Sequence, residues 1–271
     1  QATVDGTMEG EVIFPKKMNA DILRSLLKTK GSYEFNCQYF NRVTSPESRI
    51  FNPPVRRWAM DDIQVINPVI TFDPATSEKK NSCDAVVMAT GINVSSQICV
   101  LDYTVFQGAS KTPVVMIGKI FEYMAWWNIR DVVVETNGGQ EVYVHLLRDE
   151  AKKRKVSINI IEVHQHKSKE SRILALQPYW ERGNLLLKTG MMELEDQIDS
   201  FRVPINAKVD VLDALAMRIQ DEVKMSVSNA SNLSKDNGQK SYWKSGVYVP
   251  PNPYELQARE SRGGYRELIP S

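Results

Sequence analysis

Apolar and polar positions in the middle of the chain recur with two different periods, which separate predicted strands from predicted helices. Short apolar runs that alternate with polar positions, or lie between polar turns, predict strands. Apolar side chains spaced three and four residues apart, as from Pro113 onward, predict helices. The expected strands cover 69–72, 85–89, 97–103, 132–135, 157–163 and 185–187. The expected helices cover 113 to about 124, 140–155, 168–183, 193–200 and 210–224.

The order of these elements predicts the fold class. Three strands joined by short turns come first, and helices then alternate with the remaining strands. Hairpins give antiparallel pairs and helical crossovers give parallel pairs, so the order predicts an α/β fold with a mixed sheet and helices on both faces. This arrangement is similar to the ribonuclease H-like architecture.

The pattern divides the chain into three segments. Residues 1–60 are expected to form a lead-in segment with a short strand at 11–14 and a helix at 19–29. Residues 61–226 carry the regular pattern and form the predicted domain. In 227–271 the apolar periodicity fades and Ser, Asn, Gly, Pro and Lys dominate, so an extended tail is expected.

Composition narrows the class of protein further. The chain has 271 residues, of which 42% are hydrophobic and 25% charged, and this is enough to bury a sizeable core. A formal net charge of +1 gives no argument for or against a nucleic-acid partner. The three cysteines are far apart and lack metal-ligand spacing, which disfavours a zinc site and indicates a reducing compartment. Apolar runs are too short for a membrane span or signal peptide, so a cytoplasmic location is expected.

Three acidic residues stand at the ends of predicted elements. Asp73 ends the first of the hairpin strands, Glu135 ends the fourth strand, and Asp210 begins the last helix. If the first and fourth strands are parallel neighbours, Asp73 and Glu135 face each other at one rim of the sheet. Carboxylates this close raise each other's pKa unless a cation lies between them. Oxygen ligands suit Mg²⁺ or Mn²⁺, and two such ions can promote phosphodiester hydrolysis.

Each acid also has a purely structural interpretation. Asp73 precedes a proline and suits a turn, while Glu135 at the end of a buried strand could form a salt bridge with Lys or Arg. Asp210 could cap its helix, and Asp213 could favour the helix dipole. The spacing of Asp210 and Asp213 points both side chains away from the apolar stripe of that helix. The residues alone leave these alternatives open.

Several segments, taken in order, resemble the nuclease domain of tailed-bacteriophage large terminases. They are FDPAT at 72–76, the turn at 82–84, VVVETNGGQ at 132–140, HKSKESRILALQPYWERGNLLL at 166–187 and VDVLDALAM at 209–217. The resemblance spans residues 69–220. In addition, FPKKMNADILRSLLKTKGSYEFNCQYFN at 14–41 resembles the segment that these proteins carry between their ATPase and nuclease parts.

The resemblance implies roles for particular residues. It assigns Asp73 as the metal-bridging carboxylate, Glu135 as the second ligand and Asp210 as the third. Relatives often carry two adjacent acids where this chain has only Asp210, so Asp213 either completes a second metal site or supports the helix. Asp84 matches a frequent acidic position, and it is either an outer ligand or the cap of a turn. The implied cofactor is Mg²⁺ or Mn²⁺, with two ions bound.

The resemblance also implies an activity and partners. The activity is that of a metal-dependent endonuclease that cuts concatemeric double-stranded viral DNA during genome packaging. The chain has no GxxxxGK[ST] loop, so the packaging ATPase is expected in an upstream part or in a separate protein. The implied partners are double-stranded DNA, the terminase ATPase domain, the small terminase subunit and the portal protein, in the cytoplasm of the infected bacterial host.

Three basic residues near the start of the predicted helix at 168–183 are candidates for DNA contacts. Lys167, Lys169 and Arg172 are expected close to the rim that carries the acids, where they could bind phosphates. Structural pairing with Glu170 or Glu181 is the alternative.

Two other functions are compatible with this fold. A junction resolvase or transposase-like nuclease would use the same acids on branched or end-specific DNA, whereas a non-catalytic module would only dock on the motor. An actin-like ATP-binding protein is disfavoured, because the first predicted hairpin has no glycine-rich phosphate loop. Cleavage of ordinary linear duplex would favour the terminase over the resolvase.

Overall fold

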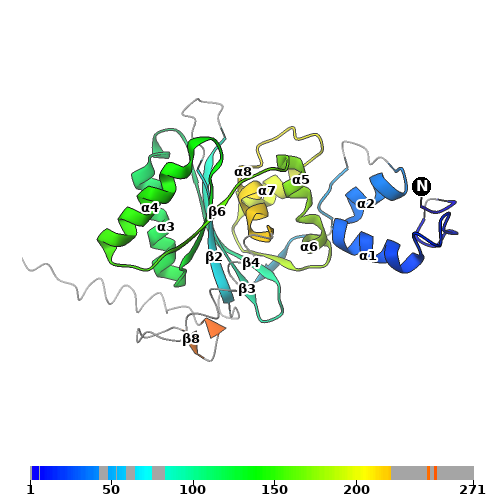
Figure 1. Cartoon of the computed structure of the whole chain (residues 1–271), viewed down its shortest axis with the longest axis horizontal. Coiled ribbons are helices and arrows are strands. Elements are labelled where there is room, and N and C mark those ends of the chain that lie inside the picture. Colours follow the sequence, from blue (N-terminus) through cyan, green and yellow to red (C-terminus); the bar gives the residue numbers. More distant parts are fainter. Residues whose placement is uncertain are drawn as a thin grey trace, which may run out of the picture.

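The computed structural model shows a single mixed sheet with helices on both faces (Figure 1). The residues that the structure describes are 2–5, 7–42, 48–52, 54–58, 65–74, 83–220, 243–244 and 247–248. Among them, no helix has both the length and the hydropathy needed to cross a membrane.

Seven strands form the main path of the sheet, in the order β1-β7-β4-β3-β2-β5-β6. The strands are β1 (Arg56–Trp58), β2 (Val65–Asp73), β3 (Ala85–Asn93), β4 (Ile98–Phe106), β5 (Asp131–Glu135), β6 (Asn159–Val163) and β7 (Leu185–Lys188). Strand β3 runs antiparallel to both of its neighbours, and the other adjacent pairs on this path are parallel. The α/β mixed sheet expected from the sequence is confirmed, including its two hairpins.

The hairpin strands are longer than the apolar runs predicted, at nine residues each. The extension of β2 passes through Asn67, which has a φ of 48°, and Pro68. The pairing register with β3 shifts between Ile66 and Val69, as expected for a β-bulge. A proline has no N–H for the ladder, and the bulge accommodates it, so the strand begins upstream of the predicted range 69–72.

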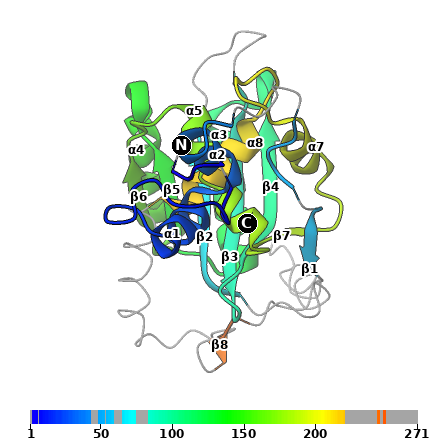
Figure 2. The same ribbon diagram turned by 90° about the vertical axis from the view of Figure 1, so that its right-hand side faces the viewer.

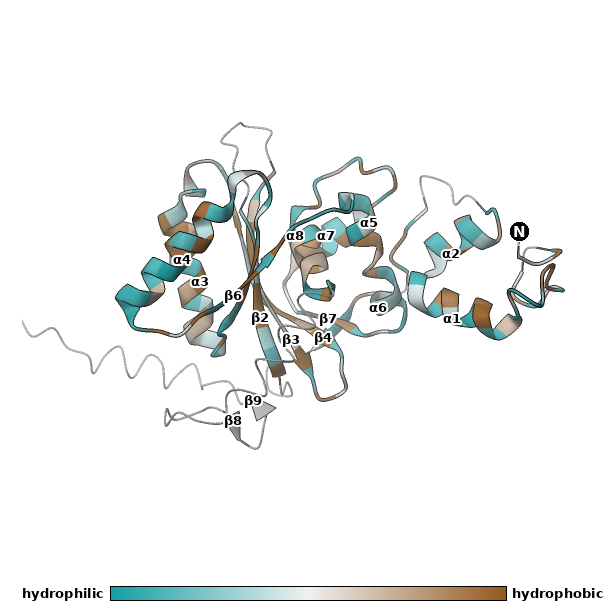
Figure 3. Ribbon diagram, viewed as in Figure 1, coloured by the Kyte–Doolittle hydropathy of each residue, from teal (hydrophilic) through white to brown (hydrophobic). Residues whose placement is uncertain are grey.

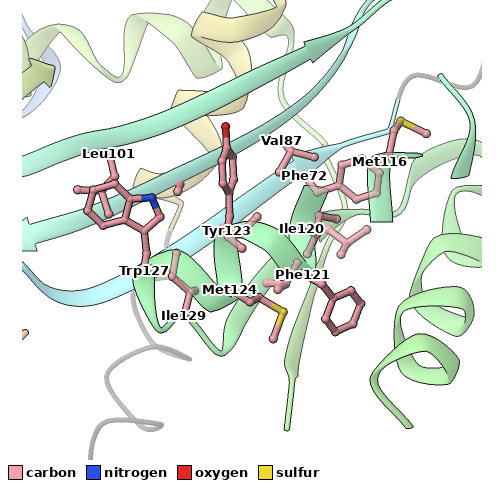
Figure 4. Packing of buried hydrophobic residues seen from close by; sticks show 14 of the residues in the cluster. Phe72, Val87, Leu101, Met116, Ile120, Phe121, Tyr123, Met124, Trp127 and Ile129 are labelled. Carbon is pink, nitrogen blue, oxygen red and sulfur yellow. The ribbon is translucent and has the colours of Figure 1, made fainter. Parts of the chain in front are cut away.

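One face of the sheet is covered by α3 (Pro113–Trp127) and α4 (Glu141–Arg154), drawn in green in Figure 1. Ile70 and Phe72 of β2 and Val132 and Val134 of β5 face these helices, because alternate residues of a strand point to the same side. Ile120, Tyr123 and Trp127 of α3 pack against this layer, as Figure 4 shows. Hydropathy colouring places the apolar strands between the helix layers (Figure 3).

The opposite face is covered by four helices that lie together in Figure 1. They are α5 (Lys169–Leu174), α6 (Gln177–Glu181), α7 (Met192–Ser200) and α8 (Asp210–Ala216), the last followed by the 3-10 turn η3 (Met217–Ile219). Val86, Met88 and Val100 point from the sheet into this second core. The helical region expected at 168–183 is therefore two helices, and Pro178 stands in the first turn of α6, where its missing N–H is tolerated.

Helix α8 differs from its predicted form. All seven of its residues are buried, including Asp210 and Asp213, so it lacks the polar outer side expected from an apolar stripe. The α-helix ends at Ala216 and η3 ends at Ile219, whereas the expected helix ran to 224; residues 221–224 lie outside the described residues. The Thr71 hydroxyl donates a 3.0 Å hydrogen bond to the Ala214 carbonyl, which fixes α8 against β2.

The N-terminal segment forms a small helical pair at one end of the molecule (Figure 1), and this pair faces the viewer, in blue, in Figure 2. It consists of α1 (Ala20–Lys30), which is capped by the Asn19 side chain, and α2 (Ser32–Tyr39). The strand predicted at 11–14 is wrong, since only an isolated bridge between Thr3 and Val12 forms.

The sheet also extends beyond the segment that carries the regular pattern. Strand β1 precedes residue 61 and pairs with β7. In the C-terminal segment, β8 (Trp243–Lys244) pairs with β9 (Val247–Tyr248), and β9 pairs with the start of β2. The rest of the predicted tail, 227–271, lies outside the described residues.

Candidate metal centre

The ends of β2 and β5 place two carboxylates side by side. The strands are parallel, and the last paired positions are Phe72 and Val134, so Asp73 and Glu135 follow at the same level. Asp73 points to the same face as Thr71, and Glu135 to the same face as Val133, because strand side chains alternate. That face is the one on which α8 packs. The expected adjacency of the two strands is thus confirmed.

Asp73 lies in an environment that opposes ionisation. Burial, followed by the charges of Glu135 and Asp213, raises the pKa of Asp73 to about 8. Lys169 acts in the opposite direction, and Asp210 adds to the rise. In the described part of the chain, no hydrogen bond or ion pair reaches the Asp73 carboxylate. An acid in this position gains from a bound cation.

Glu135 also lacks an ion pair with any described residue. Burial raises its pKa, while Arg172 opposes the rise from a distance. Among the described residues its direct partner is Asn137, whose amide donates a 3.0 Å hydrogen bond to Oε1 of Glu135. The salt bridge considered as the structural alternative for Glu135 is therefore not found among the described residues.

Asp210 is deeply buried at the start of α8, with 4% of its surface exposed. The residue at the N-cap is Val209, and no side chain caps this helix, so Asp210 does not act as the cap. Its Oδ1 accepts a 2.6 Å bond from the Lys169 ammonium, and its Oδ2 accepts a 3.0 Å bond from the backbone N–H of Asp84. Both carboxylate oxygens of Asp210 are therefore engaged.

Asp213 is engaged even more completely. The Arg172 guanidinium donates from Nε to Oδ1 at 2.9 Å and from its terminal nitrogen to Oδ2. Lys169 lies 3.7 Å from the same Oδ2. A two-pronged pair of this kind is the strongest contact that an arginine makes with a carboxylate. The geometry thus supports the structural alternative for Asp213 more than the role of a metal ligand.

Asp84 lies at the edge of this cluster and has its own partners. Its Oδ2 accepts from Lys208 at 3.0 Å and from the Gln107 amide at 2.8 Å. Its backbone N–H binds Asp210, so the residue links the start of β3 to the start of α8. The alternative role predicted for Asp84, as the cap of a turn, would involve residues 75–82, which lie outside the described residues.

The three candidate DNA-binding residues fall into two groups. Lys167 is exposed, and its carbonyl accepts a bond from Arg172. Lys169 and Arg172 direct their charges at the acids of α8. The alternative partners are used elsewhere, because Glu170 accepts from the Ile205 N–H and Glu181 from Ser32. DNA contact by Lys167, Lys169 and Arg172 stays a prediction.

The acids divide into two pairs, named here the strand acids (Asp73 and Glu135) and the helix acids (Asp210 and Asp213). Among the described residues, no group of three or more His, Cys, Asp or Glu side chains is arranged so that it could hold a metal ion. The helix acids are occupied by Lys169 and Arg172, and only the strand acids keep oxygens without a cation. The strand acids fit a divalent cation, because both are partly buried, adjacent and raised in pKa.

Sequence reasoning missed two residues that shape this rim. Asn137 donates to Glu135 and accepts from the Gln165 N–H, which fixes the turn after β5. The Gln140 amide donates a 2.6 Å bond to the Pro74 carbonyl and so joins that turn to the end of β2. The only signal in the sequence was the run of polar and glycine residues between a strand and a helix.

Comparison with known proteins agrees with this architecture. Residues 72–185 match the family model described as "Terminase Bacteriophage T7, Ribonuclease H-like domain". Among solved structures, the human cytomegalovirus terminase nuclease domain is similar, with a TM-score of 0.50 and 13% identity; 62% of this chain and 92% of that domain are covered. A comparison with curated proteins gives no match.

Two further solved structures are similar at lower scores. The large terminase of a thermophilic bacteriophage gives a TM-score of 0.49 and 10% identity, with 73% of this chain and 52% of that chain covered. This chain therefore spans about half the length of that protein. The yeast mitochondrial Holliday junction resolvase gives 0.37 and 12% identity, with 78% and 98% covered.

The fold is ribonuclease H-like, a mixed sheet whose rim carries the acids. Residues 72–185 match a terminase ribonuclease H-like family model, which agrees with the resemblance drawn from the sequence motifs.

Proposed function

We propose that this chain is a metal-dependent endonuclease that hydrolyses phosphodiester bonds of double-stranded DNA. The observation that carries the proposal is the pair of strand acids at the sheet rim. Asp73 and Glu135 lie on adjacent parallel strands, lack an ion pair among the described residues, and have raised pKa values. Their chemistry suits Mg²⁺ or Mn²⁺.

Asp73 and Glu135 would hold the metal, with Asp210 beside them. A bound divalent ion supplies an activated water and stabilises the charge that develops on the phosphate. The chain's own part is to present these oxygens in a fixed position. Glu135 is held by Asn137, and the end of β2 that carries Asp73 is held by Gln140 through Pro74. In the same proposal Asp213 supports α8, and Asp84 is an outer residue that positions Asp210.

The DNA side of the proposal rests on phosphate contacts rather than base contacts, so low sequence specificity is expected. Lys167 is the best placed of the three basic candidates, because its side chain is exposed and no described acid pairs with it. Lys169 and Arg172 would reach a phosphate only by leaving the helix acids.

A plasmid assay tests the proposed activity directly. The purified chain should nick and linearise plasmid DNA with Mn²⁺ or Mg²⁺, and excess EDTA should stop the reaction. Asp73→Asn should abolish cutting in the same assay. Cleavage that persists in EDTA, or in the Asp73→Asn protein, would contradict the proposal. Parallel reactions with linear duplex and a four-way junction separate the terminase from a junction resolvase.

The wider role proposed is cleavage of concatemeric viral DNA during packaging, in the cytoplasm of an infected bacterium. The family match of residues 72–185 supports this role. The proposed partners are the terminase ATPase domain, the small terminase subunit and the portal protein. Retention of the chain by a purified portal ring, and its loss after surface substitution, would test the docking part.

A further inference from the structure

The two pairs of acids differ in how their charge is balanced. The helix acids have two cations in direct contact, since Lys169 lies 2.6 Å from Asp210 and Arg172 binds both oxygens of Asp213. The strand acids have none within ion-pair distance among the described residues. When all four acids are ionised, these four carboxylates and the two cations leave two uncompensated negative charges among the described residues of the rim. One divalent cation would balance them.

Lys169 bridges the helix acids in the way that a metal ion would. Its ammonium is 2.6 Å from Asp210 and 3.7 Å from Asp213, so one positive charge serves two carboxylates. The burial of Lys169 lowers its pKa, but the bond to Asp210 and the charge of Asp213 more than offset this, so the ammonium stays charged. A second divalent ion at Asp210 would meet this charge at close range and be repelled.

Arg172 does not have this bridging position. Its guanidinium saturates Asp213 with two bonds and makes a further bond to the Lys167 carbonyl. Its side chain is 13% exposed, compared with 27% for Lys169. Arg172 therefore holds α5 against α8, while Lys169 is the cation that the two helix acids share.

We propose that the Lys169 ammonium takes the place of a second divalent cation, so that the chain binds one Mg²⁺ or Mn²⁺ at Asp73 and Glu135. The inference rests on the proposed nuclease function and deepens it, since it fixes the number of ions and names the residue that sets it. It replaces the expectation of two ions that the family resemblance implied.

Counting bound Mn²⁺ tests the inference without using activity. The full chain is titrated with MnCl₂ by calorimetry at about pH 8.5, where Asp73 is largely ionised, and manganese is measured after dialysis. The parent should bind one ion per chain. Lys169→Met should bind two, with the first ion held roughly tenfold or more tightly than in the parent. Lys169→Arg keeps the positive charge and should still bind one.

Lys208→Met is the matched control. It removes the same charge from a lysine that pairs with Asp84, next to the helix acids but not between them. It should leave one ion bound and change its affinity by less than about threefold. If Lys208→Met and Lys169→Met gain Mn²⁺ binding equally, the gain comes from the general loss of positive charge near the site, and the assignment to Lys169 is overturned.

Other outcomes separate this inference from the nuclease proposal. A parent that binds two ions, or a Lys169→Met protein that binds only one, overturns the inference and leaves metal-dependent cleavage intact. A parent that binds no Mn²⁺ and cuts DNA in EDTA overturns both. The parent stoichiometry needs no substitution, so the test stands even if a variant fails to fold.

Discussion

The strand acids and the helix acids are the same chemical groups in opposite electrostatic states. Asp210 and Asp213 are almost fully buried, yet each is compensated by a cation at hydrogen-bonding distance. Asp73 and Glu135 keep more exposed surface but are uncompensated by any described ion pair, and their pKa values are raised. Removing the partner of a buried, paired acid is costly, whereas a buried acid without a partner already costs stability, which is typical of functional sites.

The difference arises from which element supplies the acid. The strand acids are the last residues of two strands of the sheet, and no described basic side chain lies within ion-pair distance of them. The helix acids face α5, which carries Lys169 and Arg172 one turn apart on the side toward α8. Packing of α5 on α8 therefore neutralises the helix acids and leaves the strand acids without a cation among the described residues.

The largest expected effect is loss of cleavage when a strand acid is neutralised. Asp73→Asn and Glu135→Gln should each lower the cleavage rate by roughly a thousandfold or more, equal to about 4 kcal/mol of barrier, because a metal ligand is lost. Plasmid nicking with Mn²⁺ measures it. Neither change should lower the melting temperature of the metal-free protein. A variant that melts far below the parent yet still cuts would remove that residue from the site.

The next effect concerns stability and falls on the helix acids. Arg172→Met leaves Asp213 buried without its main partner, so the free energy of unfolding should fall by about 3 kcal/mol. Urea unfolding measures the change. Arg148→Met is the matched control, because Arg148 pairs with Glu162 on the surface and should cost less than about 1 kcal/mol. Equal losses of unfolding free energy in the two variants would mean that the buried pair stabilises the fold no more than the surface pair does.

A smaller effect is the pH dependence of the metal-free protein. The pKa of Asp73 is about 8 in the folded state and close to 3.8 in the unfolded chain. Between these values the folded state binds the proton and the unfolded state does not, so this residue makes stability fall as pH rises from about 4 to 8. The parent should therefore lose roughly 2 kcal/mol more than Asp73→Asn between about pH 6 and pH 8.

Urea unfolding of both proteins without metal, across that pH range, gives the difference directly. The comparison with Asp73→Asn removes the contributions of other titrating groups. For the parent, saturating Mn²⁺ should make the free energy of unfolding rise with pH instead of falling, because the ion binds the ionised acid. If the free energy of unfolding of the two metal-free proteins changes with pH in parallel, Asp73 ionises normally, and the raised pKa of Asp73 is contradicted.

The sequence predicted the placement of Asp73 and Glu135 on neighbouring strand ends, because that placement depends on local patterns. The end of an apolar run marks the end of a strand, and the hairpin-then-helix order makes β2 and β5 parallel neighbours. The same logic found the helices α3 and α4. The break at Pro178 had a clear signal, since a proline inside a predicted helix ends it or restarts it.

The pairing of the helix acids could not be predicted in the same way. Lys169 and Asp210 are 41 positions apart, and their contact depends on how α5 packs on α8. The periodicity of the sequence predicted that one side of α8 is polar and faces solvent. In the structure, β2, β3, α5 and α7 enclose the helix. Its two acids are then tolerated only because α5 supplies the cations, which is a property of tertiary packing and not of any motif.

The smallest effect expected here separates positioning from ligation at Glu135. Asn137 holds the Glu135 carboxylate through a 3.0 Å bond, so Asn137→Ala should weaken Mn²⁺ binding roughly tenfold, as loss of a supporting hydrogen bond does at other metal sites. Asn159→Ala is the control, because Asn159 donates a similar 2.6 Å bond to Asp131 at the far end of the same strand pair. Calorimetric titration should show normal Mn²⁺ affinity in that variant. If both variants lose affinity equally, the effect comes from general loosening of β5, and Asn137 has no particular role at the metal.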